Sequence, residues 1–439
     1  MAERTEEELA RALKAAAGLA PEPAFDLTQG IAARRRRRRR RRLQTALAVT
    51  GVVAVIGTGM TVMRGTFPGH RDGVLVEPAA SASMPPAVPA SPPSFPPATQ
   101  VWPEAVFRIP ARAKDGAEYR PVTALSARQV LLSAESPERE GRLEVYDMAT
   151  KTISVLAPVP HPARFRRYTV QGWDVDSRHI VWYATAQTAE GVPVAEFWAL
   201  PRKGGAPRLI WVLQGDDVEK VEKVNVAGDD LAWSLTTGGV FTVSLRGDEK
   251  PVRVPNSERL FLQQWPWAGD RPGRYVDDPA RNQSIVVNLE TGESRPVKAG
   301  DAQGLRCGPE WCVGERRDDR QLMSAVVQRV DGTQRREVRQ LRSFPTHDGV
   351  VDDRFAVLTV SGVVGWDITG EEVEPASVPI AVVYDRVTGA RVAVGARTKD
   401  GGGSFGRGTA SAPSDIVYWN AGRTGGREEY WVLNLAAVR

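Results

Sequence analysis

The chain has 439 residues, of which 42% are hydrophobic and 25% charged, which is ordinary for a globular protein. Residues 1–100 hold 14 basic and 8 acidic residues, whereas residues 101–439 hold 44 and 45, so the larger part is close to neutral. These values argue against a disordered chain, a multi-span membrane protein and, in residues 101–439, a nucleic-acid-binding surface, which needs clustered positive charge.

Residues 1–42 form a short segment that ends in nine consecutive arginines at positions 34–42. Thr5 and Glu8 have the spacing of a capping box, so we expect a helix over residues 6–17. The segment is interpreted either as a solvated tail that assists membrane insertion or as a docking helix for a cytosolic partner. It contains no Cys and no His, which excludes a zinc-bound head.

Residues 43–63 are the candidate membrane span. They contain no charged residue, and about 20 apolar residues cross the hydrocarbon core as a helix. The arginine run lies directly before them, and positive residues stay on the cytoplasmic side of a membrane helix. We therefore predict an uncleaved signal anchor in the plasma membrane, with the N-terminus inside. A cleaved signal peptide is the alternative, although its apolar region is usually shorter, at about 7–15 residues.

Residues 64–100 are predicted to form an extracytoplasmic linker. Eight prolines lie between positions 78 and 97, and Ala and Ser fill most of the remaining positions. This composition favours extended polyproline II structure and resists compact folding. We expect a semi-rigid stalk, at about 3.1 Å per residue.

Residues 101–439 contain seven copies of a weak repeat, each of about 48 residues. A copy begins with a turn and a β-rich run, as in DSRHIVW from Asp176, DDLAW from Asp229 and DDRFAV from Asp352. A strand, a turn and a further strand follow, as in AVVYDRVTGARVAV from Ala381. The copies that begin at Trp267 and at Cys307 are irregular. This period, with four short strands per copy, predicts an all-β fold, a seven-bladed β-propeller.

The two ends of this region complement each other. The last copy stops after the strand that begins at Tyr430, so it lacks its outer strand. Residues 105–110 have strand character and precede the first complete copy. We expect residues 105–110 to complete the seventh blade, because closure of the ring removes an exposed sheet edge.

With these repeats, residues 101–439 resemble the WD-repeat-like and TolB-like β-propellers found behind a single membrane anchor in high-GC Gram-positive bacteria. The resemblance covers about three quarters of the chain and rests on the repeat period, the hairpin turns and the anchor layout. The strict WD signature is absent. Trp173-Asp174 and Trp366-Asp367 fall at different points of the repeat, so we interpret them as core packing. The resemblance implies a rigid binding platform and no particular activity.

Cys307 and Cys312 are the only cysteines, and we predict that they form a disulfide in the fifth blade. Disulfides persist outside the cytosol, and Gly308-Pro309 between them is typical of a turn, which would place them across a hairpin. A metal site, a redox pair and two free thiols are the alternatives. No His lies within 30 residues of either cysteine, and a redox pair usually has C-x-x-C spacing.

No motif for catalysis or for cofactor or metal binding occurs. His70, His161, His179 and His347 lack metal-ligand spacing, and the chain has neither a P-loop nor a G-x-S-x-G elbow. Acidic pairs at 229–230 and 352–353 are interpreted as turn residues, because Asp bonds its own backbone there. We therefore expect no catalytic, cofactor-binding or metal-binding residues and no cofactor.

These observations favour a binding protein over an enzyme. A propeller on a stalk would present its loops to a protein, peptide or glycan partner at the cell envelope, and no nucleic-acid partner is expected. Two alternatives remain open: a transmembrane signal transducer that couples outside binding to the N-terminal segment, and an envelope hydrolase or lyase with its site at the central channel. No oligomeric state is predicted.

Overall fold

The chain divides into two compact units, Met1–Pro85 and Pro86–Arg439. The computed structural model describes residues 95–136, 140–273, 278–317, 323–338, 343–360, 379–396, 405–411, 413–424 and 427–439, all in the second unit. The predicted cytoplasmic segment and membrane helix lie outside the described residues, as does the linker up to residue 94. Among the described helices, none has the length and apolar character needed to cross a membrane.

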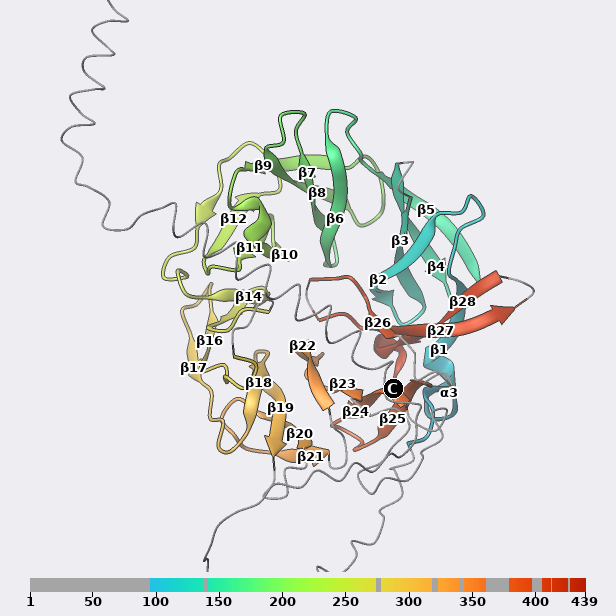
Figure 1. Cartoon of the computed structure of the whole chain (residues 1–439), viewed down its shortest axis with the longest axis vertical. Coiled ribbons are helices and arrows are strands. Elements are labelled where there is room, and N and C mark those ends of the chain that lie inside the picture. The colour runs from blue at the N-terminus through green and yellow to red at the C-terminus, as the bar shows by residue number, and fades with distance from the viewer. Residues whose placement is uncertain are drawn as a thin grey trace, which may run out of the picture. The chain divides into compact units, whose positions relative to one another are not determined.

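Within the described residues, the strands form seven four-stranded antiparallel sheets arranged in a ring (Figure 1). The first strand of each sheet lies nearest the centre of the ring, and the later strands follow outward (Figure 1). This arrangement confirms the predicted seven-bladed β-propeller.

The first three blades follow one another along the chain. Blade 1 contains β2 (Glu118–Ser126), β3 (Gln129–Glu135), β4 (Gly141–Asp147) and β5 (Thr152–Val159). Blade 2 contains β6 (Arg166–Val175), β7 (His179–Gln187), β8 (Pro193–Pro201) and β9 (Arg208–Gln214). A single turn of 3₁₀-helix, η2 (Val218–Lys220), leads into blade 3, which contains β10 (Val221–Ala227), β11 (Asp230–Leu235), β12 (Val240–Ser244) and β13 (Val252–Arg253).

The next three blades have shorter strands on average. Blade 4 contains β14 (Phe261–Gln264), β15 (Trp267–Gly269), β16 (Ile285–Asn288) and β17 (Ser294–Pro296). Blade 5 contains β18 (Gln303–Cys307), β19 (Trp311–Arg317), β20 (Met323–Arg329) and β21 (Arg336–Val338). Blade 6 contains β22 (Ser343–Val351), β23 (Phe355–Val360), β24 (Pro379–Asp385) and β25 (Arg391–Ala396).

Blade 7 joins the two ends of the domain. It contains β26 (Phe405–Arg407), β27 (Ile416–Thr424), β28 (Arg427–Asn434) and β1 (Val106–Pro110). Strand β1 pairs antiparallel with β28, with Ile109 opposite Tyr430, and Ile109 is fully buried. The prediction that residues 105–110 complete the seventh blade is therefore confirmed.

Short helical turns flank this closure. Helix α3 (Ala98–Val101) and the 3₁₀-helix η1 (Pro103–Ala105) precede β1, and η4 (Leu435–Ala437) follows β28. Residues just before α3 already contact blade 6, since the Ala393 amide donates to the Pro96 carbonyl at 2.9 Å. Trp102 packs edge-on against Phe355 in blade 6, with 6.0 Å between ring centroids. Contacts of the propeller thus begin before residue 101, where the sequence placed its boundary.

The repeated hairpin turn has a local cause. The carboxylate of Asp147 accepts hydrogen bonds from the amides of Ala149 and Thr150, at 2.9 and 3.0 Å, where β4 turns into β5. Asn288 and Asp385 make the same kind of contact at the ends of β16 and β24. Such side chains reproduce a backbone turn two residues on, so the repeat is visible in sequence.

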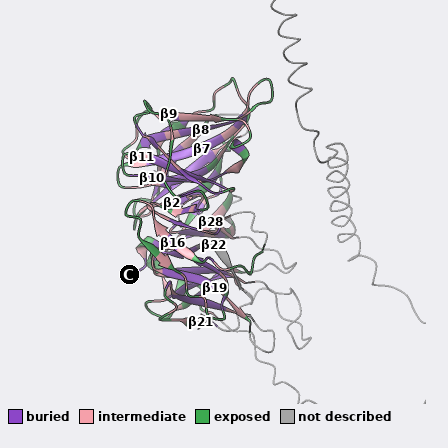
Figure 2. Cartoon of the chain, turned by 90° about the vertical axis from the view of Figure 1, so that its left-hand side faces the viewer, coloured by how far each residue is buried: buried purple, intermediate pink, exposed green. Residues whose placement is uncertain are grey.

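The core lies between adjacent blades rather than in the centre of the ring. Buried side chains of blade 2 pack against blade 3, for example Phe197 on Trp233, with ring centroids 4.8 Å apart. Figure 2 shows the buried strands as continuous purple layers with exposed turns at their ends. Each blade therefore depends on its neighbour for burial of its apolar face.

Candidate functional site

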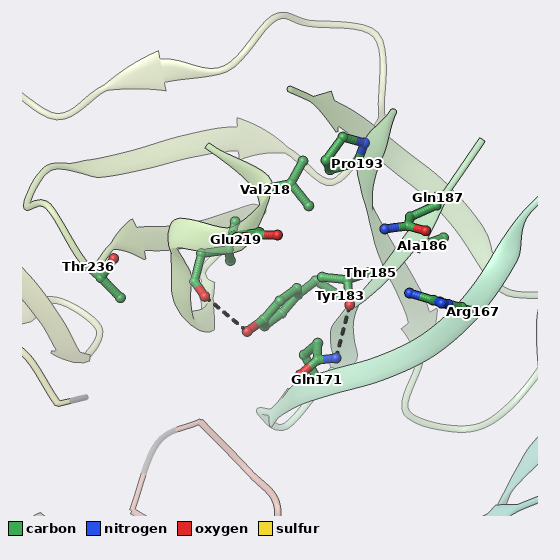
Figure 3. Close-up of a pocket in the computed structure, with 11 residues that line it drawn as sticks. Arg167, Gln171, Tyr183, Thr185, Ala186, Gln187, Pro193, Val218, Glu219 and Thr236 are labelled. Atoms are coloured by element: carbon green, nitrogen blue, oxygen red, sulfur yellow. Dashed lines mark hydrogen bonds between the residues drawn. The ribbon is translucent and has the colours of Figure 1, made fainter. Parts of the chain in front are cut away.

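Polar cavities lie on the face of the ring at which the first strand of each blade begins, which we call the top face. One of them, the Arg167 pocket, lies between blades 2 and 3 and has a volume of about 400 Å³. It is lined by residues 185–187 and 218–219, with Arg167, Gln171, Tyr183, Pro193, Val221 and Thr236. Figure 3 shows side chains from β6, β7 and the blade 2–3 connection around it.

A break in the β6–β7 ladder positions Arg167. The register shifts between Arg166 and Thr169, and Arg167 adopts a φ of 54°, in the left-handed region that few non-glycine residues occupy. Its side chain is exposed and has no ion-pair partner among the described residues. The strand irregularity thus places an unpaired cation at the cavity.

Fixed polar groups form the rest of the pocket. The Gln171 side-chain amide donates to the Thr185 hydroxyl at 2.9 Å, and the Tyr183 hydroxyl donates to the Val221 carbonyl at 3.3 Å (Figure 3). Glu219 adds one exposed carboxylate. Amides, hydroxyls, one cation and one carboxylate can orient a polar ligand by hydrogen bonding.

A second cavity of about 450 Å³ lies between blades 1 and 2 and shares Arg167 with the first. His161 and Tyr168 line it and stack with ring centroids 5.1 Å apart. Behind them, the fully buried carboxylate of Glu196 accepts from Arg164 at 2.6 Å and from Tyr168 at 3.2 Å. Burial and the Glu196 charge raise the pKa of Tyr168, so its hydroxyl remains a hydrogen-bond donor.

A third and larger cavity, of about 1320 Å³, follows the junction of blades 7 and 1, and we call it the seam groove. It is lined by residues 112–115, 151–153 and 427–428, with Pro110, Tyr119, Arg142, Glu144 and Val155. The groove includes Arg142 at the start of β4 and Thr152 at the start of β5. Because these two strands are antiparallel, their starts lie at opposite ends of the blade, so the groove runs from the top face along the outer side of blade 1.

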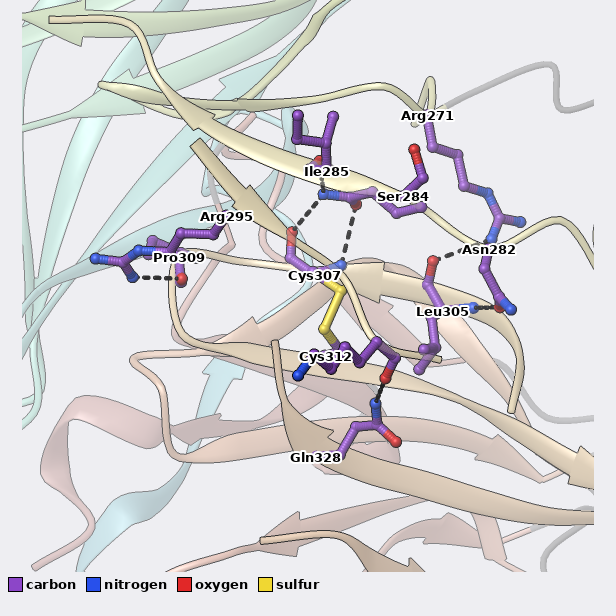
Figure 4. Close-up of a disulfide and its surroundings, with 12 residues drawn as sticks. Arg271, Asn282, Ser284, Ile285, Arg295, Leu305, Cys307, Pro309, Cys312 and Gln328 are labelled. Carbon is purple, nitrogen blue, oxygen red and sulfur yellow. Dashed lines mark hydrogen bonds between the residues drawn. A yellow bond between two sulfur atoms is a disulfide. The ribbon is translucent and has the colours of Figure 1, made fainter. Parts of the chain in front are cut away.

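The central channel carries basic side chains around a cavity of about 30 Å³, room for one or two waters. Arg271 is 5% exposed and donates to the carbonyls of Pro279, at 2.8 Å, and Leu305, at 3.3 Å (Figure 4). Burial, followed by the nearby charge of Arg306, lowers the pKa of Arg271 to about 10. These contacts tie the β15–β16 connection of blade 4 to β18 of blade 5.

The structure contains the predicted disulfide between Cys307 and Cys312 in blade 5 (Figure 4). The two residues are paired across the β18–β19 hairpin, with their Cα atoms 3.9 Å apart. The Gly308 amide donates to the Trp311 carbonyl at 2.8 Å and closes the turn between them. The disulfide is buried, which fits a structural role.

The structure describes the side chains of two of the four histidines, His161 and His179. His161 stacks on Tyr168, and His179 is half-buried on β7. His70 lies outside the described residues, and His347 lies in β22, where its side chain is not described. In the described parts of the chain, no three His, Cys, Asp or Glu side chains gather into a potential metal site.

The acidic and Trp-Asp motifs have structural roles where they are described. Asp352 and Asp353 lie in the β22–β23 turn, both with positive φ. Trp173 is buried, and the Asp174 carboxylate accepts from the Val226 amide at 2.7 Å, which joins blade 2 to blade 3. Burial raises the pKa of Asp174 to about 6. The pair at 366–367 lies outside the described residues.

The sequence analysis did not identify the Arg167 pocket or the seam groove. Arg167, Thr185 and Thr236 carry no motif, and they meet only because three strands and a blade connection converge. The left-handed conformation of Arg167 depends on a ladder irregularity that its own sequence does not indicate.

No protein-family model matches the chain, and no curated protein sequence matches it. Similar solved structures include the uncharacterized protein lmo1340 from Listeria monocytogenes EGD-e, with 8% identity over 71% of this chain and 92% of that one and a TM-score of 0.43. TolB from Acinetobacter baumannii is 14% identical over 50% of this chain and 53% of its own, with a TM-score of 0.31. The WD40 domain of SCAP from fission yeast is 10% identical over 76% and 99%, with a TM-score of 0.33. These similarities concern the fold alone, and the assignment as a seven-bladed β-propeller comes from the sheet order.

Proposed function

We propose that the chain is a single-pass membrane protein whose propeller lies outside the plasma membrane and acts as a binding platform. Its ligand is a protein, peptide or glycan of the cell envelope, and the Arg167 pocket is the binding site. The membrane part of the proposal is supported by the uncharged stretch at 43–63 and the arginines directly before it.

The observation that carries the binding role is the composition of the Arg167 pocket. A cavity of about 400 Å³ is within the size range of pockets that bind small ligands or part of a larger one. Its exposed cation has no ion-pair partner among the described residues, and the Gln171 amide and the hydroxyls of Tyr183 and Thr185 lie on strands. Strand-borne polar groups are positioned before a ligand arrives, which reduces the entropy cost of binding.

The binding role is tested with full-length protein in detergent micelles, applied to an array of peptidoglycan fragments, wall polysaccharides and peptides. Arg167→Ala should weaken the strongest signal at least tenfold, because a charge-assisted hydrogen bond is lost. Arg246→Ala is the matched control, since Arg246 is exposed on another blade. Equal binding by both variants and the wild type would remove the Arg167 pocket from the proposal.

The topology is tested separately with single cysteines. The two native cysteines are joined in a disulfide, so they give little background with a maleimide reagent. In intact cells, a membrane-impermeant maleimide should label Thr150→Cys in the propeller. Thr5→Cys should be labelled only after the cells are broken. Labelling of Thr5→Cys in intact cells would contradict the proposed orientation.

A further inference from the structure

The seam groove has a rigid polar floor. The Tyr119 hydroxyl donates to the Glu144 carboxylate at 2.6 Å, and both side chains are buried. Arg142 donates to the same carboxylate and also binds both oxygens of Asp115, at 2.7 and 3.2 Å. Two of the acidic side chains in the groove are therefore already paired with protein groups.

This network also holds the turn between β1 and β2. The Ala113 amide donates to the Ala117 carbonyl at 2.8 Å, and the Gly116 amide donates back to Ala113 at 3.0 Å. Asp115 lies between them and is held by Arg142. The turn that carries Lys114 is consequently fixed over the groove.

Three of the exposed cations that line the groove come from three different elements, and a fourth, Arg112, donates to the Gly116 carbonyl at 3.4 Å. Lys114 lies on the β1–β2 turn, Lys151 lies directly before β5, and Arg427 begins β28. Among the described residues, none of the three has an ion-pair partner. With five cations in its lining and three carboxylates, those of Asp115, Glu144 and Glu428, the groove carries a net positive charge, and such a surface attracts anionic partners.

One wall of the groove is the edge of a sheet. Strand β5 is the last strand of blade 1 and has eight residues; the corresponding strands β9 and β25 have seven and six, and β13, β17 and β21 have two or three. Val155 on β5 is 65% exposed and lines the groove, next to half-buried Ile153. An exposed strand edge with apolar side chains can accept a further strand from another chain.

We propose that the seam groove binds an extended acidic peptide segment of a partner protein, which adds as a strand to β5. Alternate side chains of the added strand face the groove; the acidic ones among them pair with Lys114, Lys151 and Arg427, and an apolar one contacts Ile153 and Val155. This site is separate from the Arg167 pocket, with which it shares no lining residue.

The strand edge and Val155 favour a peptide over an anionic polysaccharide. A polysaccharide could pair with the three cations, but it has no backbone amides to continue the ladder of β5. It also has no aliphatic side chains to cover Val155, whose burial contributes about 25 cal/mol per Å². Binding of an anionic polysaccharide is therefore an outcome that the experiment must distinguish.

The experiment measures fluorescence anisotropy of a labelled octapeptide with full-length protein in detergent micelles. In the peptide, Ser alternates with Glu, Val, Glu and Glu, so that one face of the strand carries both the carboxylates and the valine. The triple variant Lys114→Glu, Lys151→Glu, Arg427→Glu should bind at least tenfold more weakly, because it replaces attraction by repulsion. The matched control is a second triple variant, Lys203→Glu, Arg246→Glu, Lys250→Glu. It changes three exposed cations on blades 2 and 3. The control should bind as the wild type does, and thermal melts of both variants verify folding.

Two further comparisons test the strand addition itself. Val155→Asp should weaken binding severalfold, whereas Val252→Asp, at a valine that is 64% exposed on β13, should not. The same octapeptide with alternate N-methyl groups on its inner edge should lose binding, because it cannot pair with β5.

The proposal is overturned if the octapeptide does not bind, if the triple variant binds like its control, or if the N-methylated peptide binds as well as the unmodified one. It is also overturned if alginate, an anionic polysaccharide, competes fully with the peptide while Val155→Asp has no effect. Arg167→Ala should leave peptide binding unchanged, so the result here and the result for the Arg167 pocket can be separated.

Discussion

Blades 2 and 4 have the same sheet order but are stabilised in different ways. The four strands of blade 2 have 10, 9, 9 and 7 residues, whereas those of blade 4 have 4, 3, 4 and 3. Blade 4 therefore makes far fewer ladder hydrogen bonds, and it must obtain stability from other contacts.

Blade 2 is stabilised by aromatic burial. Trp182 is fully buried and lies between Trp173 and Trp198, with ring centroids 5.1 and 6.2 Å away. Tyr183 and Phe197 form a second stack that reaches Trp233 of blade 3. Large aromatic side chains bury the most apolar area, so long strands and an aromatic interface support each other.

Blade 4 is stabilised by side chains that bond to backbone. Gln283 donates to the carbonyls of Ile285 and Cys307 and accepts from the Cys307 amide. Asn282 accepts from the Leu305 amide at 2.9 Å and donates to the Ala302 carbonyl at 2.8 Å. These contacts replace missing ladder bonds and attach blade 4 to blade 5. A short-stranded blade can thus persist in the ring when polar side chains satisfy its backbone.

The largest effect is expected for Trp182→Ala in blade 2. Removing this side chain should cost about 3–5 kcal/mol of unfolding free energy, because it leaves a cavity between two other rings. Trp267→Ala, at a half-buried tryptophan of blade 4, should cost clearly less. Denaturant unfolding followed by circular dichroism measures both. Equal losses would contradict the difference between the blades.

Gln283→Ala should destabilise blade 4 by about 2–3 kcal/mol, since it leaves the Cys307 amide and other buried groups without partners. The same change at Gln264, which is exposed on the neighbouring strand β14, should have little effect. Chemical denaturation of the two variants gives the comparison. A silent Gln283→Ala variant would show that backbone bridging does not support blade 4.

Loss of the disulfide should have a slightly smaller effect. The bridge joins residues five positions apart, so it constrains only a small loop, and its removal should cost about 2 kcal/mol. Cys307→Ala combined with Cys312→Ala should melt at a lower temperature than the oxidised wild type. Reduced wild type should melt close to the variant. An unchanged melting temperature on reduction would be the contrary result.

A pH dependence of stability is expected from Asp174 in blade 2. Its pKa is about 6 in the folded protein, above the ordinary value of 3.8, so the folded state binds more protons between these values. Stability should therefore fall as the pH rises from about 4 to 7, by about 3 kcal/mol from this group. Asp174→Asn should flatten this part of the profile in melts at several pH values. Parallel profiles for the variant and the wild type would contradict this assignment.

The contrast between blades also explains what could be predicted from the sequence. The regular copies were recognisable because their turns are local: Asp176, at the start of one copy, accepts from the amides of Arg178 and His179. The copy at Trp267 was irregular because the strands of blade 4 are short and depend on Gln283 and the distant residue Cys307. Local turn chemistry is visible in one sequence, whereas long-range bridging is not.

The closing strand and the disulfide were also predicted. The disulfide followed from the short spacing of the two cysteines, and the closing strand followed from the strand that the last repeat lacks. The candidate sites were not. The seam groove combines a turn near residue 114, strand β5 and the start of β28, and no spacing in the sequence relates these parts. Its positive charge becomes evident only from the fold, because five cations and three carboxylates from separate segments of the chain meet in its lining.

Ring closure by β1 and β28 has a consequence for synthesis of the protein. Arg108 and Glu429, which meet across this pair of strands, are 321 residues apart in the chain. At a translation rate of about 5–20 residues per second, β1 waits tens of seconds for its partner to leave the ribosome. The six blades between them can form in order during that interval, but the ring closes only after the last strand has been made. Truncated chains consequently keep an open edge, which is the form most prone to aggregate.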